Sequence, residues 1–403
     1  DADTLLEFSA GIGDGQARYA GRGMDGAQFK RESHGLRFEK TFQGALRKLQ
    51  ASLFRNDADH VMDNYTLRDP NPMGAMPMPM AANVDRTTDG GRVAAEWEWE
   101  RFSLTAGADR QRSRHRQRSS MGDAYKTLPW EDDAGFRNTG LFAEGTWTLD
   151  AGRRVVAGAR ADRAEATDKR ATTGMMDMPN PTFGQTRRES LPAGFVRYER
   201  DIDGSGFGWY TGVGHTERMP DYWELISPGM GPMAAANAFA GIQPEKTTQI
   251  DIGGQYHGQR VDAWVSAYTG RIDDYILFAY LSGGMMGMTS MASNVNARIH
   301  GAEAGIEFRP AAGWKLGGNL AWAWGENASA GTPLPQMTPL EGRFNVAWDN
   351  SRWSFGALLR VVARQGRVGL AAAQLQHLLQ RHFVVGAAPV GKAGDGGHEL
   401  GVF

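Results

Sequence analysis

The 403-residue chain contains no cysteine, which excludes a disulfide framework, a thiolate metal site and a cysteine nucleophile. Histidine and methionine therefore remain as its borderline and soft metal ligands. The chain also has no apolar run of about 18 residues, so a membrane-spanning helix is excluded, and the residues that follow Asp1 show no signal-peptide pattern. A transmembrane β-barrel stays possible, because its alternating strands give only a weak hydropathy signal.

Neither sign of charge is in excess. Lys and Arg number 44 and Asp and Glu 46, for a net charge of −2, which gives no electrostatic reason to expect nucleic acid as a partner. The sequence also lacks a Gly-x-Ser-x-Gly elbow, a phosphate-binding glycine loop and a His-Glu-x-x-His helix. We therefore do not expect an enzyme.

The pattern that is present is an alternation of apolar and polar residues. In residues 93–99, Val93, Ala95, Trp97 and Trp99 share one face of an extended strand, opposite a more polar row. The same alternation returns at 141–149 and 353–361. A period of two residues indicates β-strands of one kind.

The connections between these strands differ in length. Tight turns at 150–153, 201–206 and 349–352 are interleaved with much longer polar or Met-rich segments. We count about fifteen strands of roughly ten residues between residues 1 and 363, with tryptophans near strand ends as in an aromatic girdle. The sequence therefore predicts an all-β fold, a transmembrane antiparallel β-barrel. A soluble β-sandwich or propeller also alternates, but its loops are not long on one side only.

The C-terminal residues 368–403 break this pattern. Residues 371–381 have a helix-favouring composition, and residues 384–397 lack sustained alternation. We expect no barrel strand there and interpret the segment as an atypical tail, either disordered or the product of a shifted reading frame.

One segment, residues 217–225, resembles the Arg-x-Pro-x-x-x-Glu-Leu stretch of TonB-dependent receptors. Further segments occur in that family's order around 243–246, 296–303 and 335–343. The apolar phase changes near Gly301, which predicts a β-bulge at that residue. The positions that match the family are Arg218, Pro220, Glu224, Leu225, Pro244, Glu245, Gly301 and Glu303.

Residues 18–26 and 59–64 resemble the copper-receptor branch of the same family. The resemblance implies a protein of the Gram-negative outer membrane that imports copper with the energy of the TonB complex. Family members carry an N-terminal plug inside a barrel of about twenty-two strands. The resemblance therefore implies that residues 1–367 are a partial barrel, with the plug domain and the last strands absent.

The resemblance also implies the copper ligands, which are a Cys-x-x-x-Met pair from the plug and a His-x-Met pair from the barrel. His60 and Met62 match the second pair. The preceding residues Lys48, Gln50 and Ser52 share their parity, so His60 and Met62 are expected to face the lumen if the strand has no bulge. Imidazole and thioether ligands favour copper, particularly Cu(I), over Mg²⁺ or Ca²⁺.

Most of the 18 methionines lie in long connections. Their thioethers could collect copper and pass it inward, or they could form apolar loops over the barrel mouth, and the sequence leaves both interpretations open. The clustered residues are Met73, Met76, Met78, Met80, Met175, Met176, Met178, Met230, Met233, Met285, Met286, Met288 and Met291.

A run of arginines at Arg110, Arg112, Arg114, Arg116 and Arg118 follows a predicted strand and would form one cationic row if extended. This row would either contact lipopolysaccharide phosphates or be a solvated loop. The other histidines, among them His34, His115, His215, His257 and His300, show no ligand spacing. Two alternative functions stay open, a receptor for a metal chelate such as a siderophore, and a truncated barrel that is inactive or a passive pore.

Overall fold

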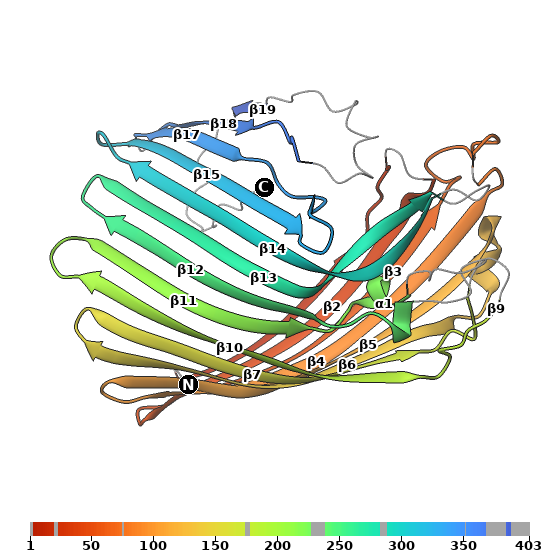
Figure 1. The fold of residues 1–403 in the computed structure, drawn as a ribbon, viewed down its shortest axis with the longest axis horizontal. Helices are drawn as coiled ribbons and strands as arrows, with labels where there is room; N and C mark the ends of the chain where they lie inside the picture. Colours follow the sequence, from red (N-terminus) through yellow and green to blue (C-terminus); the bar gives the residue numbers. More distant parts are fainter. Residues whose placement is uncertain are drawn as a thin grey trace.

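A computed structural model describes residues 3–19, 23–74, 76–173, 178–226, 238–282, 288–350, 352–367 and 384–387. Over these residues the chain forms one curved antiparallel sheet of 17 strands, shown in Figure 1. No helix in the described residues has the length and apolar character needed to cross a bilayer.

Fifteen of these strands are long. In chain order they are β1 (Thr4–Gly13), β2 (Asp25–Thr41), β3 (Leu46–Asp63), β4 (Met80–Glu98), β5 (Phe102–Met121), β6 (Glu131–Asp150), β7 (Arg153–Asp168), β10 (Thr186–Ile202), β11 (Phe207–Arg218), β12 (Glu245–His257), β13 (Val261–Ser282), β14 (Met288–Phe308), β15 (Trp314–Asn327), β17 (Glu341–Asp349) and β18 (Ser354–Val362).

The short elements lie in or beside the connections. They are the 3-10 helices η1 (Gly122–Thr127) and η3 (Ala238–Ala240), the helix α1 (Tyr222–Ile226), and four short strands. The strands β16 (Thr332–Pro333) and β19 (Val384–Ala387) belong to the large sheet, whereas β8 (Thr172–Thr173) and β9 (Met178–Pro179) form a separate two-stranded sheet.

Each long strand pairs with the long strand that follows it in the chain, so the sheet is a simple meander. Tight turns join the strands at one end of the sheet, for example between Asp150 and Arg153, and the longer connections lie at the other end (Figure 1). Among the described residues, β1 pairs only with β2, and β18 only with β17 and β19, so the sheet is not closed.

The predicted barrel strands are confirmed in number, but not in length. The long strands run from 9 residues in β17 to 22 residues in β13. In the tail, where we expected no strand, the four residues of β19 pair with β18.

The convex face of the sheet is apolar over a broad band. Leu53 of β3 and Leu141 of β6 are 62% and 64% exposed, and Val93, Ile250 and Leu359 are also exposed on this face. The register places these residues on the same side of neighbouring strands. This exposure would be unfavourable in water and is typical of strands that face lipid.

Aromatic rings gather at the end of the sheet that carries the tight turns. Trp99, Phe102 and Trp147 stack in a row with centroid separations of 5.6 and 4.7 Å, and Trp314 contacts Trp348 at 6.3 Å. These residues form the predicted girdle at one edge of the apolar band.

The bulge predicted at Gly301 is wrong. The register of β14 runs unbroken through Gly301 on both sides, where Tyr268 and Ala323 are its partners. The bulge lies in β13 between Ile272 and Tyr275, and Asp274 there has a φ of 58°. The apolar phase changes in β14 for a different reason. Beyond the band, its apolar residues turn inward and pack with Ile272, Leu334 and Met337.

Candidate functional site

The strand β3 supplies one wall of a cavity of about 970 Å³ on the inner side of the sheet. Its register with β4 is continuous from Lys48 to Asp63, so alternate residues keep one direction over this length. Phe54, Asn56, Ala58 and His60 line the cavity. The predicted inward parity is therefore confirmed for this strand, and Met62 lies on the same face as His60.

Small residues surround Met62, whereas an aromatic ring contacts His60. Met62 lies opposite Gly26 in β2 and Ala82 in β4. A bulge at Ala27 shifts the register of β2, and beyond it Phe29 lies opposite His60. The Phe29 and His60 rings meet edge to face, with centroids 4.9 Å apart. Alternate residues of a strand are about 7 Å apart, so both donor groups can reach one ion.

An ion pair holds the start of β2 next to this site. Asp25 is fully buried, and Arg68 Nε donates to its Oδ2 at 2.7 Å. The backbone N–H of Tyr19 donates to Asp25 Oδ1 at 2.8 Å, and Arg68 also donates to the Tyr19 carbonyl at 2.9 Å. Hydrogen bonding to the Asp25 carboxylate raises the pKa of Arg68 above its ordinary value. The ion pair and the bond to the Tyr19 carbonyl connect Tyr19 and Asp25 to the connection that follows β3.

That connection contains the first methionine cluster, and Asn64 holds it. The Asn64 side chain is almost completely buried. Its Nδ2 donates to the carbonyls of Met76 and Met78, each at 3.0 Å, and its Oδ1 accepts from the Met80 N–H at 2.8 Å. These three hydrogen bonds fix the backbone of residues 76–80 beside the end of β3.

The two segments that resemble copper receptors therefore meet at the first methionine cluster. A Cβ atom at Gly23 would lie 2.3 Å from Met76 Cε, so the backbone at Gly23 packs closely on this side chain. Met73 is 94% exposed and Met78 53%, whereas Met76 and Met80 are half-buried. The exposed thioethers are accessible from the end of the sheet with the long connections.

The other predicted methionine positions are only partly covered by the structure. Met178 lies in β9, within a long connection. Met288 and Met291 belong to β14, so the prediction that they lie in a connection is wrong. The remaining clustered methionines, Met175, Met176, Met230, Met233, Met285 and Met286, lie outside the described residues.

The family motif folds the chain after β11 into the cavity. Arg218 donates to both carboxylate oxygens of Glu224, at 2.8 and 2.9 Å, and to Glu245 at 2.8 Å. Glu245 in turn accepts the N–H of Ile276 at 2.7 Å. Leu225 is fully buried in a cluster with Ala166 and Phe239. The motif therefore positions α1 on the inner side of the sheet, as Figure 1 shows.

The other motif residues continue this arrangement. Pro220 is buried and lines the large cavity beside Met219 and Trp223. Pro244 precedes β12, whose first residue is Glu245. Gly301 lies under the Tyr268 ring, where a Cβ atom would be 2.3 Å from Tyr268 Cε1, and its neighbour Glu303 is paired with Ser266 and Ala321.

His115, to which the sequence assigned no role, lines the same cavity as His60. Its ring stacks on Tyr222 of α1 with centroids 4.4 Å apart and an interplanar angle of 13°. The Tyr222 hydroxyl donates to Asp133, and burial raises the pKa of this tyrosine above its ordinary value. His115 Nε2 and Asp133 Oδ1 are buried without a hydrogen-bond partner among the described residues.

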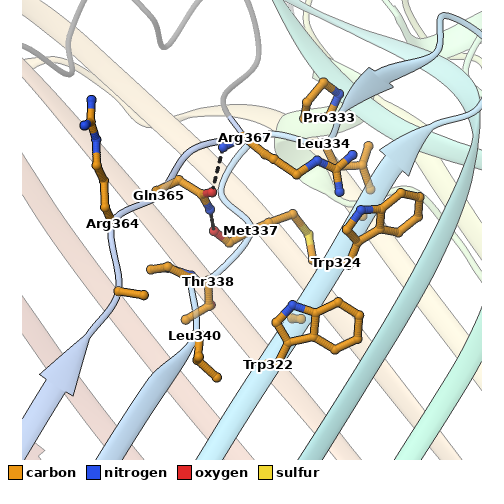
Figure 2. Close-up of a pocket in the computed structure, with 14 residues that line it drawn as sticks. Trp322, Trp324, Pro333, Leu334, Met337, Thr338, Leu340, Arg364, Gln365 and Arg367 are labelled. Atoms are coloured by element: carbon orange, nitrogen blue, oxygen red, sulfur yellow. Dashed lines mark hydrogen bonds between the residues drawn. The ribbon is translucent and has the colours of Figure 1, made fainter.

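A second, smaller cavity of about 190 Å³ lies where residues 364–367 cross the end of β15 (Figure 2). The Arg367 guanidinium lies 4.4 Å from the Trp324 ring centroid, and Gln365 Nε2 donates to the Met337 carbonyl at 2.6 Å. Its described lining contains one thioether and no imidazole or carboxylate, so we assign it no metal. Within the described residues, no three His, Asp or Glu side chains cluster as a metal site.

The arginine row lies within β5, not after a strand as predicted. Three of its five members have partners. Arg114 pairs with Asp132 at 2.6 Å and Arg116 with Asp85 at 2.8 Å. Arg118 donates to Asn83 at 2.8 Å and lies 4.2 Å from the Trp130 ring.

Comparison with known proteins gives a family profile and solved structures. The profile described as "TonB dependent receptor-like, beta-barrel" matches residues 2–380. The structure named "Copper transporter OprC" is 50% identical, with a TM-score of 0.88 over 92% of this chain and 59% of that chain. No curated protein matches the chain in sequence.

Two other structures share the fold alone. The FrpB iron transporter of Neisseria meningitidis is 14% identical, with a TM-score of 0.64 over 89% of this chain and 56% of that one. The alcaligin receptor FauA of Bordetella pertussis is 15% identical, with a TM-score of 0.59 over 90% and 58%. The chain spans less than two thirds of each of these three structures. From the profile, the chain belongs to the TonB-dependent receptor β-barrel family.

Proposed function

We propose that this chain is the barrel part of an outer-membrane copper importer. The observation that carries the proposal is the His60 and Met62 pair: His60 lines the inner cavity, and Met62 lies on the same side of β3, next to a methionine cluster whose backbone Asn64 holds. The structure of similar sequence is a copper transporter. Imidazole and thioether donors suit copper and do not suit the hard cations Mg²⁺ and Ca²⁺.

In this proposal the further copper ligands come from a part of the receptor outside the described residues. Two ligands form a weak site, so a plug inside the barrel contributes the further donors, and the TonB complex moves the plug to release copper into the periplasm. The exposed thioethers of Met73 and Met78 bind copper first and pass it to His60 and Met62. Copper crosses the membrane without any covalent chemistry.

The test is the copper content of the purified complete protein, measured by metal analysis after equilibration with copper. The proposal expects stoichiometric copper in the wild type and its loss in the His60→Ala, Met62→Ala double variant. A matched control, His257→Ala with Met337→Leu, removes one imidazole and one thioether that do not line this cavity and should keep its copper.

Copper absent from the wild type would contradict the proposal and would favour a receptor for a metal chelate. Steady conductance of the wild type in planar bilayers would favour a passive pore instead.

A further inference from the structure

Four arginines form a compact group on the outer face of β5, β6 and β7. Arg112 and Arg137 are direct cross-strand partners. Two residues closer to the tight turns, Arg110 lies opposite Thr139 of β6, and Thr139 lies opposite Arg163 of β7. Neighbouring strands are about 4.8 Å apart, so the four residues arise from a patch roughly 10 Å wide. All four are exposed.

The charges of this arginine group are poorly neutralised within the protein. Among the described residues, Arg110, Arg112 and Arg163 make no side-chain hydrogen bond and no ion pair. Arg137 lies 3.4 Å from Glu165, which also accepts from Arg188 at 3.2 Å. The carboxylates that border the group are Glu165 and Asp89, the latter opposite Arg112 on β4.

Like charges directly opposite each other on a sheet are destabilising, so the pairing of Arg112 with Arg137 opposes folding. The arginines farther along β5 differ, because Arg114 and Arg116 each have an aspartate partner. The arginine group therefore has the charge and the free donors for an anion that the chain does not supply. Guanidinium groups bind phosphate through paired hydrogen bonds, which makes phosphate the best match.

The position of the group identifies the source of the phosphate. The residues two positions nearer the tight turns are Ala108, Leu141 and Ala161, and Leu141 belongs to the exposed apolar band. Two residues of a strand span about 7 Å, so the guanidinium groups lie at the border of this band. They lie at the end with the long connections, which in outer-membrane barrels is the extracellular end. Phosphates at this level belong to the glycolipid of the outer leaflet.

We propose that Arg110, Arg112, Arg137 and Arg163 bind the phosphates of lipopolysaccharide at the outer face of the barrel. The inference rests on the membrane placement in the proposed function and does not depend on copper. The proposed site is therefore not the row of alternate arginines along β5 but a group that spans β5, β6 and β7.

The experiment uses the complete protein with all four arginines changed to glutamine, extracted from outer membranes in mild detergent. Lipopolysaccharide bound per protein is measured by native mass spectrometry in the absence of copper. Four charge-assisted contacts are removed, so we expect roughly a tenfold or greater loss of bound glycolipid. The control Arg101→Gln, Arg200→Gln, Arg260→Gln removes charge at the tight-turn end and should keep the wild-type level.

Two further measurements separate the possible results. Wild-type protein that binds inorganic phosphate at the arginine group but retains no lipopolysaccharide would indicate a free-phosphate site and would overturn the proposal. Equal lipopolysaccharide in the quadruple variant and the wild type would also overturn it. Because no copper is present, failure of the copper proposal would leave this result unchanged. A far-UV circular dichroism spectrum equal to that of the wild type would show that the quadruple variant is folded.

Discussion

Replacing Asn64 with alanine tests whether one buried amide fixes the first methionine cluster. The substitution removes the two hydrogen bonds to the carbonyls of Met76 and Met78 and the one from the Met80 N–H. A hydrogen bond contributes about 1 kcal/mol net, and water can reach some of the freed groups because Met78 is exposed. We therefore expect residues 76–80 to lose about 2–3 kcal/mol of local stability.

Hydrogen exchange followed by mass spectrometry measures this local loss. A change of 2–3 kcal/mol corresponds to exchange roughly 30 to 150 times faster in peptides that contain the Met80 amide, with the rest of the sheet unchanged. Asn64→Asp should have at least the same effect, because a carboxylate cannot donate to the Met76 and Met78 carbonyls. The matched control Asn345→Ala, at an exposed position in β17, should not alter exchange in this segment.

The result that would refute the reasoning is exchange in Asn64→Ala within about twofold of the wild type, since this is below the effect of one hydrogen bond. If the cluster passes copper to His60, the same variant should also need more copper for half-maximal uptake. Faster exchange with unchanged uptake would keep the structural role of Asn64 and contradict the relay.

Three further perturbations test other parts of the molecule. Arg218→Ala should free α1 from the cavity and increase protease cleavage after β11. The expected local cost is roughly 2–3 kcal/mol, less than for a fully buried ion pair, because the Arg218 side chain is 45% exposed and solvent screens the pair. Leucine nearly conserves the volume of methionine, so replacing the first cluster by leucine should keep the fold and lower uptake at low copper; unchanged uptake would support the apolar-loop interpretation. Tyr65 donates to Asp123 at 2.8 Å, and this bond lowers the Asp123 pKa below its ordinary value of 3.8. The contact between the connection after β3 and η1 is therefore fully present above pH 3.8 and lost as pH falls through the lower folded pKa. The Arg118 guanidinium lies 5.6 Å from the Tyr125 ring of η1 and 4.2 Å from the Trp130 ring, so the fluorescence difference between the wild type and Trp130→Phe should report that loss. Tyr65→Phe should abolish its acid dependence.

The alternation of apolar residues predicted the barrel strands only where one face meets lipid. In β4 it covers residues 93–99, although the strand begins at Met80. The earlier half of β4 contains Asn83, Asp85 and Arg86, which contact neighbouring strands or line the cavity instead of facing an apolar solvent. Beyond the lipid-facing band, neither side of a strand has to be uniformly apolar, so the sequence no longer alternates. The full length of the strand then cannot be predicted from periodicity.

The end of the lipid-facing band also explains why the sequence wrongly predicted a bulge at Gly301. Apolar residues of β14 face outward near Ile306, which is 52% exposed, and inward at Ile299 and Ala297, where the connection with Leu334 covers them. The direction of burial reverses along a continuous strand. A prediction from periodicity assumes that the apolar residues of a strand all lie on one face. The change of face in β14 therefore looks, in the sequence, like the extra residue of a bulge.

The inward direction of His60 could be predicted because it depends on parity within one strand. The surroundings of the site could not, because they depend on contacts between distant segments. Arg68 reaches Asp25 through the connection after β3, and Tyr222 stacks on His115 where the chain turns inward after β11, at the ion pair between Arg218 and Glu224. None of these pairs has a periodic spacing in the sequence. The cavity is therefore formed by the barrel wall, which local alternation predicts, and by connections that polar contacts direct into it, which only the three-dimensional structure defines.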